Sequence, residues 1–586
     1  MNFIKIIFGS MLGFFLSIIV LMFVLATLIG SLKSFGEKEK IVVNSNSVLT
    51  LYLDHKIPDR TPNKPEDIFN FNSMFKIEPG LFDIIRMIKT AKDDINIKGI
   101  YLHLSDIPTS YATISEIRMA LKQFKESGKF IYAYGDTFSQ KAYYLATVAD
   151  RIFINPLGSI DLKGVYVQIA FYKGLLEKLE VEAQVVRHGE YKSAVEPFIM
   201  DKMSAANRKQ TKKFTQTIWD NVAMDIADDR GLSVEQVNTA ADNLMLQDPK
   251  EAKDLGFVDD LITYDVFLER LSEELGVNRV EKHNFVEERS YYTSIRNIGK
   301  WSSDRIAIVY ASGNIVKGEN AVEGAISDGE FSQIIRGLRL DEKIKGVVLR
   351  VNSPGGDALS SDIILHELEL LKEVKPVVVS MGGVAASGGY YIACKADFIY
   401  AEPSTITGSI GVFGIIPNIQ KMLNNKLGIT FDEVKSNSNS DYISLNKPMQ
   451  TFQRRKLKAQ IEKIYSTFIQ HVSIGRHMSV PSVDSIGQGR VWAGRDALAI
   501  GLIDAFGGID EAIKKVVDLG QLSVYRLVEF PKQKEMFQQI LDDLSGRNMF
   551  SLGKGFQETQ ETLQYLDDMI QCRTIQARIP YSLIIK

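Results

Sequence analysis

Two segments of this 586-residue chain repeat one another, and this internal repeat constrains the fold more than any other feature. Residues 97–165 align without a gap on residues 344–412, and a weaker match of residues 255–259 with 500–504 extends the repeat. Because chance does not align so many unlike residue types, the chain is a tandem duplication of one domain. The matched positions include Ile97-Lys98-Gly99 with Ile344-Lys345-Gly346, Tyr143-Tyr144 with Tyr390-Tyr391, Ala149-Asp150 with Ala396-Asp397, Pro156 with Pro403, and Gly164-Val165 with Gly411-Val412.

The length and the repeat together divide the chain into two related domains. One hydrophobic core does not usually extend over 586 residues, whereas two domains of about two hundred residues or more lie in the usual size range. The stretch from Glu287 to Asp304 is polar and aperiodic, so we place a linker there. We expect a membrane anchor at residues 1–32, an N-terminal repeat at 33–290, a linker at 291–304, a C-terminal repeat at 305–530 and a helical tail at 531–586.

Apolar runs and helical segments alternate in both halves. In the second half, residues 306–310, 346–351 and 377–380 are expected to be strands, and helices are expected at 330–338 and 360–373 and from Gly388 onward. Continuous Val and Ile runs that alternate with helices are typical of a largely parallel sheet covered on both faces. The predicted fold class is therefore α/β, built twice.

An apolar segment lies near the N-terminus. From Ile6 to Ser31 there is no charged residue, and about 20 apolar residues suffice to cross the bilayer core. A cleaved signal peptide would have a shorter apolar core and a clearer exit, so we expect one retained transmembrane helix. Lysines on both sides leave its orientation open. Gly9 and Gly13 form a small-xxx-small pair that could bring helices together, although such pairs also arise by accident.

Composition excludes some classes of function. The net charge of −3 argues against nucleic acid as the main partner. The two cysteines, Cys394 and Cys572, provide no metal-binding pattern and at most one disulfide. Cys394 lies in an apolar helical stretch, so we expect it to be a buried structural residue.

Ser387 is the candidate nucleophile. It lies in the segment GGVAASGGY (382–390), directly after an apolar strand and at the expected start of a helix. Small neighbours let a peptide backbone approach the hydroxyl, and a helix N-terminus offers free N–H groups to a developing anion. Taken alone, the same residues are also typical of a helix cap in a tight turn.

The differences between the two copies favour chemistry in the second one. The segment NSPGGD (352–357) closes the strand before Ser387 and could present backbone amides to an oxyanion, although such a turn alone is weak evidence. The first copy has Ile107-Pro108-Thr109 in place of Pro354-Gly355-Gly356, and Gln140-Lys141-Ala142 in place of Ser387-Gly388-Gly389. The fold residues match, whereas the hydroxyl and the glycines do not. The oxyanion candidates are Gly355, Gly356 and Gly388.

A serine nucleophile needs a base, and no obvious histidine triad is present. A lysine can serve instead when burial lowers its pKa toward neutrality. The first copy contains GEYKSAVEPF (189–198), which includes Lys192, and the second copy places Asn439 or Ser440 opposite this lysine. On sequence alone, a single lysine is more often a surface residue than a base.

The chain resembles the signal peptide peptidase A (protease IV) family in its long two-repeat bacterial form, a peptidase family of the Clp protease/crotonase fold. The most specific matching segments are YKSAVEPF (191–198), ASGGY (386–390) and TGSIG (407–411). The resemblance implies that Ser387 is the nucleophile, that Lys192 from the other repeat is the general base, and that Ser409 orients the lysine. The first copy has Leu162 opposite Ser409.

The resemblance also implies a substrate and a setting. It implies a serine endopeptidase that degrades apolar peptides, notably signal peptides left in the membrane, without a cofactor or metal. It further implies a homotetramer in the bacterial inner membrane, with the catalytic part on the periplasmic side. Two alternatives stay open: a crotonase-like acyl-CoA enzyme with the same fold, and a non-catalytic membrane scaffold.

Overall fold

The computed structural model describes residues 13–17, 19–20, 43–63, 78–281, 284–295, 302–319, 324–533 and 575–578. Most of the segment predicted to be a transmembrane helix, and most of the predicted tail after residue 531, lie outside these residues. Within the ranges just given, no helix combines the length and the apolar character that crossing a bilayer requires.

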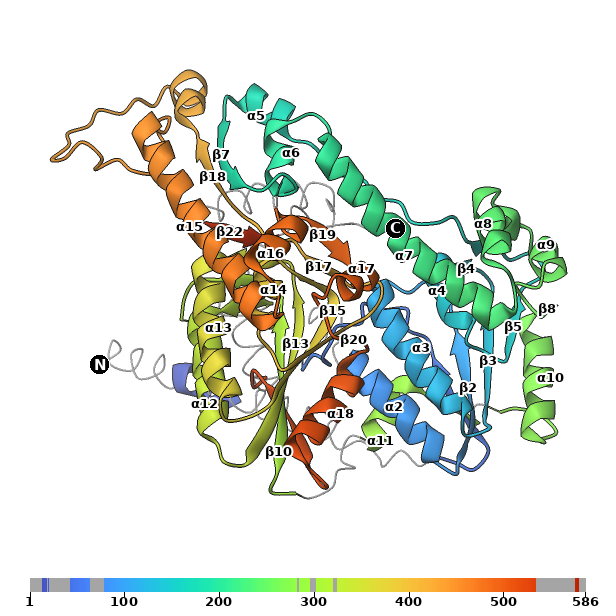
Figure 1. Cartoon of the computed structure of the whole chain (residues 1–586). Helices are drawn as coiled ribbons and strands as arrows, with labels where there is room; N and C mark the ends of the chain where they lie inside the picture. The colour runs from blue at the N-terminus through green and yellow to red at the C-terminus, as the bar shows by residue number, and fades with distance from the viewer. Residues whose placement is uncertain are drawn as a thin grey trace, which may run out of the picture.

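The first half is an α/β unit built on a parallel sheet of six strands (Figure 1). The strand order in this sheet is β8-β5-β3-β2-β1-β9. Its elements are β1 (Ser47–Leu51), α2 (Leu81–Asp93), β2 (Ile97–His103), α3 (Tyr111–Lys125), β3 (Phe130–Gly135), β4 (Phe138–Ser139), α4 (Gln140–Ala146), β5 (Arg151–Ile154), β6 (Ile160–Asp161), α5 (Lys173–Leu179), β7 (Glu182–His188), α6 (Glu196–Ile199), α7 (Ala205–Arg230), α8 (Val234–Asp242), α9 (Pro249–Asp254), β8 (Asp260–Leu261), α10 (Tyr264–Leu275), β9 (Phe285–Glu287) and α11 (Glu288–Ile295).

The second half repeats this plan with a larger sheet. The main strand order is β19-β17-β15-β13-β10-β21, with β16 pairing beside β15 and β20 beside β16. Its elements are β10 (Arg305–Ser312), β11 (Asn314–Val316), β12 (Ala325–Ser327), α12 (Asp328–Leu340), β13 (Ile344–Ser353), β14 (Gly355–Asp357), α13 (Ala358–Lys372), β15 (Val377–Ala386), α14 (Gly388–Ala393), β16 (Phe398–Ala401), β17 (Ile406–Gly408), β18 (Val412–Asn418), α15 (Thr451–Gly475), α16 (Val480–Ile486), β19 (Val491–Ala493), α17 (Gly494–Ala499), β20 (Ala505–Phe506), α18 (Ile509–Gly520), β21 (Arg526–Phe530) and, near the C-terminus, β22 (Gln576–Arg578).

The aligned residues occupy equivalent places in the two sheets. The helices α3 and α13 begin and end at aligned positions. In chain order, α3 connects β2 to β3, and α13 follows β13 and β14 and leads to β15. Tyr143 and Tyr390 are aligned, and their hydroxyls donate hydrogen bonds of 2.8 Å to the carbonyls of Phe257 and Leu502. The α/β duplication predicted from the sequence is therefore present in the structure.

The two halves share one hydrophobic core. The largest cluster of buried side chains includes residues of β2 and β3 from the first sheet and of β10, β13 and β15 from the second. Helices α2 and α3 of the first half and α18 of the second also contribute to it, and Figure 1 shows these helices between the two sheets. Because burial of this surface depends on both sheets, each half stabilises the other.

A buried ion cluster also joins the halves. Arg350 on β13 is fully buried and donates hydrogen bonds to Asp59, at 2.8 Å, and to Glu116 on α3, at 2.6 Å. The other carboxylate oxygen of Glu116 accepts the backbone N–H of Ile509 at 2.9 Å. Asn352, two residues after Arg350, donates to the second oxygen of Asp59 at 2.8 Å. The cluster therefore connects α3 to the end of β13, just before the glycine turn.

The boundary between the halves differs from the predicted one. Residues 291–295 of the expected linker belong to α11, whose Tyr291 is fully buried against the first half. The strand before it, β9, pairs in parallel with β1. The polar, aperiodic pattern concealed a short amphipathic helix, because among its described residues only Tyr291 and Ile295 are buried apolar side chains, and Tyr292 is partly buried beside them.

Candidate active site

A third sheet crosses from one half to the other. Its order is β12-β11-β14-β22-β18-β7, so among the strands of this sheet that the structure describes β7 alone comes from the first half. β7 and β18 pair antiparallel over seven residues each, from Val412 opposite His188 to Asn418 opposite Glu182. Since Lys192 follows β7 and Ser409 precedes β18, this pairing brings the two residues together from opposite repeats.

Ser387 occupies a strained turn between β15 and α14. Its φ of 55° and ψ of −112° lie outside the usual region for a residue with a side chain, and such strain is common where a reactive group is presented. The backbone N–H of Ser387 donates to the Gly408 carbonyl at 2.8 Å, which fixes the turn. Its hydroxyl forms no helix-capping hydrogen bond. The alternative that this serine only caps the helix is therefore not supported.

The Lys192 amine lies directly beside the Ser387 hydroxyl. The distance from Lys192 Nζ to Ser387 Oγ is 2.8 Å, and both side chains are fully buried. Within the described ranges, no carboxylate forms an ion pair with Lys192, and the Phe413 ring centroid lies 5.9 Å from its Nζ. Burial therefore lowers the pKa of Lys192 well below its ordinary value, since desolvation penalises the charged ammonium.

Ser409 contacts the lysine through two oxygen atoms. Lys192 Nζ donates to the Ser409 carbonyl and to Ser409 Oγ, both at 3.1 Å. The Ser409 hydroxyl in turn donates to the Gly489 carbonyl at 3.5 Å. The structure thus brings together Ser387, Lys192 and Ser409. By contrast, Asn439 and Ser440, either of which the alignment could place opposite Lys192, are both exposed in a turn between β18 and α15.

The three glycines chosen as oxyanion candidates lie together beside Ser387, but their N–H groups differ. The N–H of Gly355 donates to Ser353 Oγ at 3.1 Å, so it does not point freely toward a substrate. Gly388 is the first residue of α14, and its N–H has no acceptor within the helix. A Cβ added to Gly355 would lie 2.6 Å from Gly388 N, so only glycine leaves this approach open. Gly388 is thus better placed as a donor than Gly355, whereas Gly356 lies within β14, opposite Ile315 of β11 and Ala577 of β22.

The first copy fills the corresponding place with a side chain. Gln140, opposite Ser387, accepts the N–H groups of Lys163 and Gly164 at 2.9 Å each. Its amide nitrogen donates to the Gly164 carbonyl at 3.0 Å and to the Tyr111 hydroxyl at 2.5 Å. These hydrogen bonds pair the backbone groups of Lys163 and Gly164 with the Gln140 side chain, so this loop of the first copy is held in place without a serine.

Sequence reasoning missed the segment that holds the lysine in place. Residues 488–490 contact both sides of the site: the Gln488 carbonyl accepts the Tyr191 N–H at 2.9 Å, and the Arg490 carbonyl accepts the Ser409 N–H at 2.7 Å. A Cβ added to Gly489 would lie 2.6 Å from Lys192 Cα. The glycine-rich sequence Gly487-Gln488-Gly489 was a visible signal, but nothing in it indicated a contact with Lys192.

Gln210 on α7 was also missed. Its amide nitrogen donates to the Tyr191 carbonyl at 3.1 Å and to Ser193 Oγ at 2.9 Å, while its oxygen accepts the Val491 N–H at 3.2 Å. The side chain therefore connects the loop around Lys192 with the second half. No local sequence pattern marks this glutamine, because its partners are distant in the chain.

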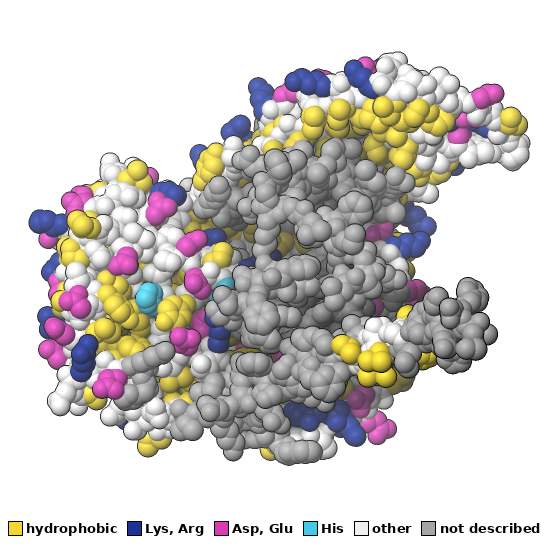
Figure 2. Space-filling model, turned by 180° about the vertical axis from the view of Figure 1, so that it is seen from behind, with side chains coloured by type: hydrophobic (Ala, Val, Ile, Leu, Met, Phe, Trp, Pro, Cys, Tyr) yellow, Lys and Arg dark blue, Asp and Glu magenta, His cyan; other side chains and the backbone are white. Residues whose placement is uncertain are grey.

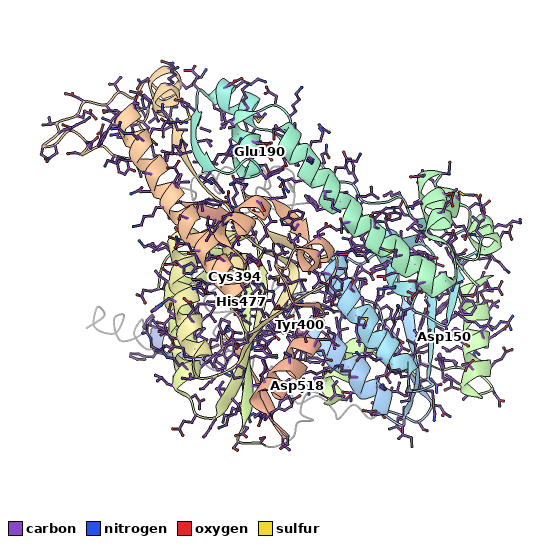
Figure 3. All side chains as sticks on the ribbon, in the orientation of Figure 1. Asp150, Glu190, Cys394, Tyr400, His477 and Asp518 are labelled. Atoms are coloured by element: carbon purple, nitrogen blue, oxygen red, sulfur yellow. The ribbon has the colours of Figure 1, made fainter. Side chains whose placement is uncertain are left out.

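Two labelled residues in Figure 3 locate the surroundings of the site. Glu190 lies in the turn before Lys192, and Cys394 follows α14 on the second half. Cys394 is free and fully buried, and burial raises the pKa of its thiol to about 12. The expectation that it is a buried structural cysteine is thus confirmed.

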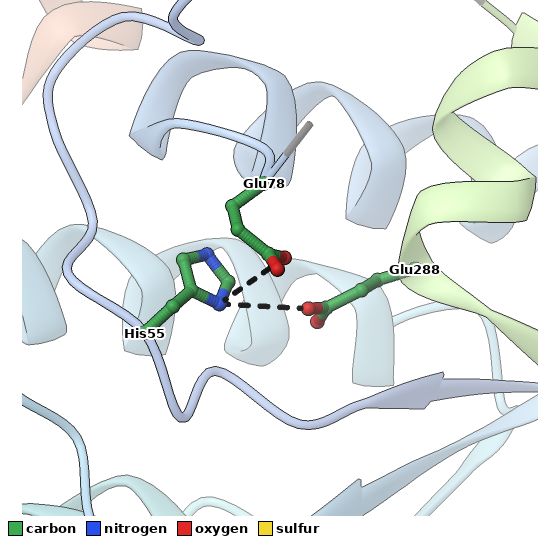
Figure 4. Close-up of side chains that lie close together, drawn as sticks. All are labelled: His55, Glu78 and Glu288. Atoms are coloured by element: carbon green, nitrogen blue, oxygen red, sulfur yellow. Dashed lines mark ion pairs between the residues drawn. The ribbon is translucent and has the colours of Figure 1, made fainter. Parts of the chain in front are cut away.

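A separate cluster of titratable groups surrounds His55 (Figure 4). Its Nδ1 lies 3.7 Å from Glu78 and 3.8 Å from Glu288, a grouping that could in principle hold a metal ion. However, the Arg289 guanidinium already pairs with Glu78, and Glu288 accepts the Tyr52 N–H at 3.1 Å. A cation would compete with Arg289 for the same carboxylate. The contacts of Glu288 and Arg289 with Tyr52 and Glu78 hold α11 against the first half.

Comparisons with known proteins agree with the repeated architecture. The sequence profile of peptidase family S49 matches residues 123–278 and 369–523. Protease 4 of Salmonella typhi is 37% identical over 478 residues, which cover 80% of this chain and 76% of that protein. Protease 4 of Haemophilus influenzae is 34% identical over 511 residues, which cover 83% and 81%, respectively.

A plant relative and one solved structure add to these matches. Serine protease SPPA, chloroplastic, of Arabidopsis thaliana is 32% identical over 548 residues, which cover 92% of this chain and 78% of that protein. A ClpP1 mutant from Listeria monocytogenes is 13% identical and covers 35% of this chain and 94% of that chain, with a TM-score of 0.24. That score is too low to support an argument about the fold.

Proposed function

Because this chain belongs to peptidase family S49 and is a serine protease, we propose that Ser387 and Lys192 form its catalytic dyad. The family resemblance seen in the sequence is confirmed by these relatives, whereas the roles of the two residues are our proposal. The observation that carries it is the 2.8 Å distance between Lys192 Nζ and Ser387 Oγ within a buried site.

The hydrogen bonds around the lysine support its role as a base. A neutral amine has two hydrogens and one lone pair. Ser409 offers two acceptors for the hydrogens, since its carbonyl cannot donate and its hydroxyl hydrogen is directed to Gly489. The lone pair is then left to face the Ser387 hydroxyl. Ser409 would therefore act as a positioning residue for Lys192.

The reaction follows from this arrangement. Lys192 takes the proton of the Ser387 hydroxyl as Oγ attacks the carbonyl carbon of a peptide bond. The N–H groups near Gly356 and Gly388 stabilise the oxyanion of the tetrahedral intermediate. Lys192 then gives its proton to the leaving amine as the C–N bond breaks. Water, deprotonated by the same lysine, attacks the acyl-enzyme, and Ser387 recovers its proton.

We further propose that the substrates are apolar peptides, notably signal peptides left in the membrane. Support comes from the family resemblance and from the apolar segment at residues 6–31, which would anchor the enzyme in the bacterial inner membrane with its catalytic part on the periplasmic side. Digestion of vesicles that carry a labelled signal peptide tests this. Cleavage no faster than that of a polar peptide of equal length would argue against it.

Assembly into a homotetramer is a second part of the proposal. Figure 2 shows hydrophobic side chains along the arm at the upper right of that view. Exposed apolar residues on the elements of this arm, around β18 and α5, suit contact with other copies of the chain. Light scattering of the purified chain gives the number of subunits, and a monomer would contradict the proposal. These exposed residues are Leu179, Leu427, Ile429, Phe431 and Val434.

Single substitutions of the dyad test the catalytic proposal. Ser387→Ala and Lys192→Ala should each lower kcat/KM for an apolar peptide by about 10³-fold or more, because the two residues act as a unit. The measurement is hydrolysis of a fluorogenic peptide, with circular dichroism to show that the fold is retained. If either variant kept full activity, the assignment of the dyad would be wrong.

The remaining alternatives predict different results in the same preparation. A crotonase-like enzyme would turn over acyl-CoA and would not need both Ser387 and Lys192. A scaffold would hydrolyse neither substrate. The buried contact between a serine and a lysine with a lowered pKa favours peptide hydrolysis over both.

A further inference from the structure

The short strand β22 fills a gap between two strands that carry the proposed catalytic groups. In the third sheet it lies between β14 and β18 and pairs antiparallel with both. Figure 1 draws it in dark red, beside β18. β14 contains Gly355 and Gly356, and β18 begins three residues after Ser409. A segment from near the C-terminus therefore crosses the site itself.

The register of β22 places one carbonyl at the oxyanion candidates. Gly356 lies opposite Ala577, and the Ala358 N–H donates to the Ile575 carbonyl at 3.1 Å, which continues the pairing. A Cβ added to Gly388 would lie 3.0 Å from the Ala577 carbonyl oxygen, and one added to Gly355 would lie 2.1 Å from it. This carbonyl thus lies where the carbonyl of a substrate would approach Ser387.

The first copy has no equivalent of this arrangement. Residues 108–110, aligned with β14, form no strand, and within the described part of the first repeat no strand lies beside them. β22 is therefore not a scaffold element that the duplicated fold requires. It occurs only beside the half that carries Ser387.

We propose that β22 occupies the place of a bound peptide substrate, so that residues 575–578 act as an intramolecular competitor at the active site. This inference rests on the proposed function of the same site. A substrate would add as an antiparallel strand between β14 and β18, through main-chain hydrogen bonds, after β22 had left.

Competition of this kind requires a segment that is weakly held but always near. β22 has only three residues, so few hydrogen bonds oppose its release. Because it is tethered to the same chain, its effective concentration at the site is on the order of millimolar. An apolar substrate can bind only to molecules from which β22 has left the site. Its apparent Kd is therefore the intrinsic Kd divided by the fraction of such molecules.

Two variants at Ala577 separate strand pairing from side-chain effects. Ala577→Pro removes the N–H that an antiparallel partner requires, whereas Ala577→Gly keeps it. In A577P the KM for an apolar fluorogenic peptide should fall about fivefold with kcat little changed, and in A577G both values should stay within about twofold of those of the unaltered chain.

A binding measurement makes the test independent of catalysis. With Ser387→Ala added to each variant, fluorescence anisotropy should show that a labelled apolar peptide binds about fivefold more tightly to the A577P chain than to the A577G chain. If the dyad assignment failed, this comparison would still report on β22. Equal affinities in the two chains would overturn the proposal, as would a higher KM for A577P at unchanged melting temperature.

A synthetic peptide covers the case in which A577P folds poorly. An eight-residue peptide with the sequence of residues 574–581, added to the unaltered chain, should raise KM without changing kcat. A scrambled peptide of the same composition serves as the control. If both peptides failed to raise KM at millimolar concentration, β22 would not be a ligand of the active site.

Discussion

At the residue scale, the proposed role of Lys192 as a base depends on its burial. An exposed lysine is almost fully protonated at neutral pH and has no lone pair for a serine proton. Here the side chain is fully buried, and desolvation lowers its pKa well below the ordinary value. The same burial costs folding free energy, because the charged ammonium that the unfolded chain favours loses its hydration when it is buried.

This cost gives a pH-dependent prediction for Lys192→Met. Because the pKa of Lys192 is lower in the folded chain, the unfolded chain binds more protons between the two pKa values, and stability rises with pH there. Methionine has no proton to lose. The melting temperature of K192M should therefore exceed that of the unaltered chain at neutral pH, and the difference should shrink as the pH rises toward about 10.

Ser387→Ala is the matched control for this measurement. It also removes activity but keeps the amine, so its melting temperature should follow the pH dependence of the unaltered chain. A K192M chain whose stability advantage did not change with pH would mean that Lys192 is charged in the folded state.

Part of the site was visible in individual residues. The small residues around Ser387 and the absence of a hydroxyl at Gln140 indicated which copy carries the proposed nucleophile. The role of Lys192 came from the family resemblance, because no local pattern distinguishes a buried lysine from an exposed one. The hydrogen bond from Gly355 to Ser353 depends on the exact turn geometry, so it could not be predicted.

At the element scale, the loop between α16 and β19 holds the base in position. Gly489→Ala should abolish most activity, because the new Cβ would lie 2.6 Å from the backbone and Cβ of Lys192. We expect kcat/KM to fall by about 10²-fold or more, since small misplacement of a catalytic group has large effects on rate. Peptide hydrolysis and the melting temperature should both be measured.

Gly501→Ala controls for backbone strain in that experiment. Gly501 has a φ of 80°, close to the 81° of Gly489, but the nearest atom to its added Cβ is Met478 Sδ at 4.0 Å. G501A should therefore lose about 1 kcal/mol of stability and keep its activity. Equal loss of activity in both variants would show that strain, and not contact with Lys192, explains the effect.

The elements themselves were predicted to different degrees. Apolar strands and the repeat gave the α/β order of the second half, because parallel buried strands leave a clear local pattern. The pairing of β7 with β18 could not be predicted, since it joins segments more than two hundred residues apart and depends mainly on backbone hydrogen bonds, which leave no pattern in the sequence. β22 could not be predicted either, because its three residues have no distinctive pattern and pair with strands that are distant in the chain.

At the scale of the whole molecule, the halves are coupled by the cluster around Arg350. Its guanidinium donates to Asp59 and Glu116, and its strand leads directly to the glycine turn beside Ser387. The two carboxylates come from the first half and the arginine from the second. Formation of this cluster therefore links folding at the interface to the geometry of the site.

Arg350→Met should destabilise the chain strongly. Removing one partner of a buried ion cluster leaves uncompensated charge and costs about 3–5 kcal/mol. Here Asp59 and Glu116 would both lose their cation. Urea denaturation, followed by tryptophan fluorescence, should show the loss.

Arg270→Met offers the comparison, because Arg270 pairs with Glu273 at 3.5 Å and both side chains are more than half exposed. An exposed pair of this kind contributes about 0–1 kcal/mol. A similar small effect in R350M would mean that water reaches the Arg350 cluster and that it does not hold the halves together.

The division of the proposed dyad between repeats would also determine when the enzyme becomes active during its synthesis. The base is made 195 residues before the nucleophile, and β18 follows later still. A ribosome-bound chain that ends before β18 has a lysine without the strand pairing that positions it. If the two residues act as proposed, such a chain should have no hydrolytic activity, and the growing polypeptide would be protected from Ser387 until both repeats have emerged.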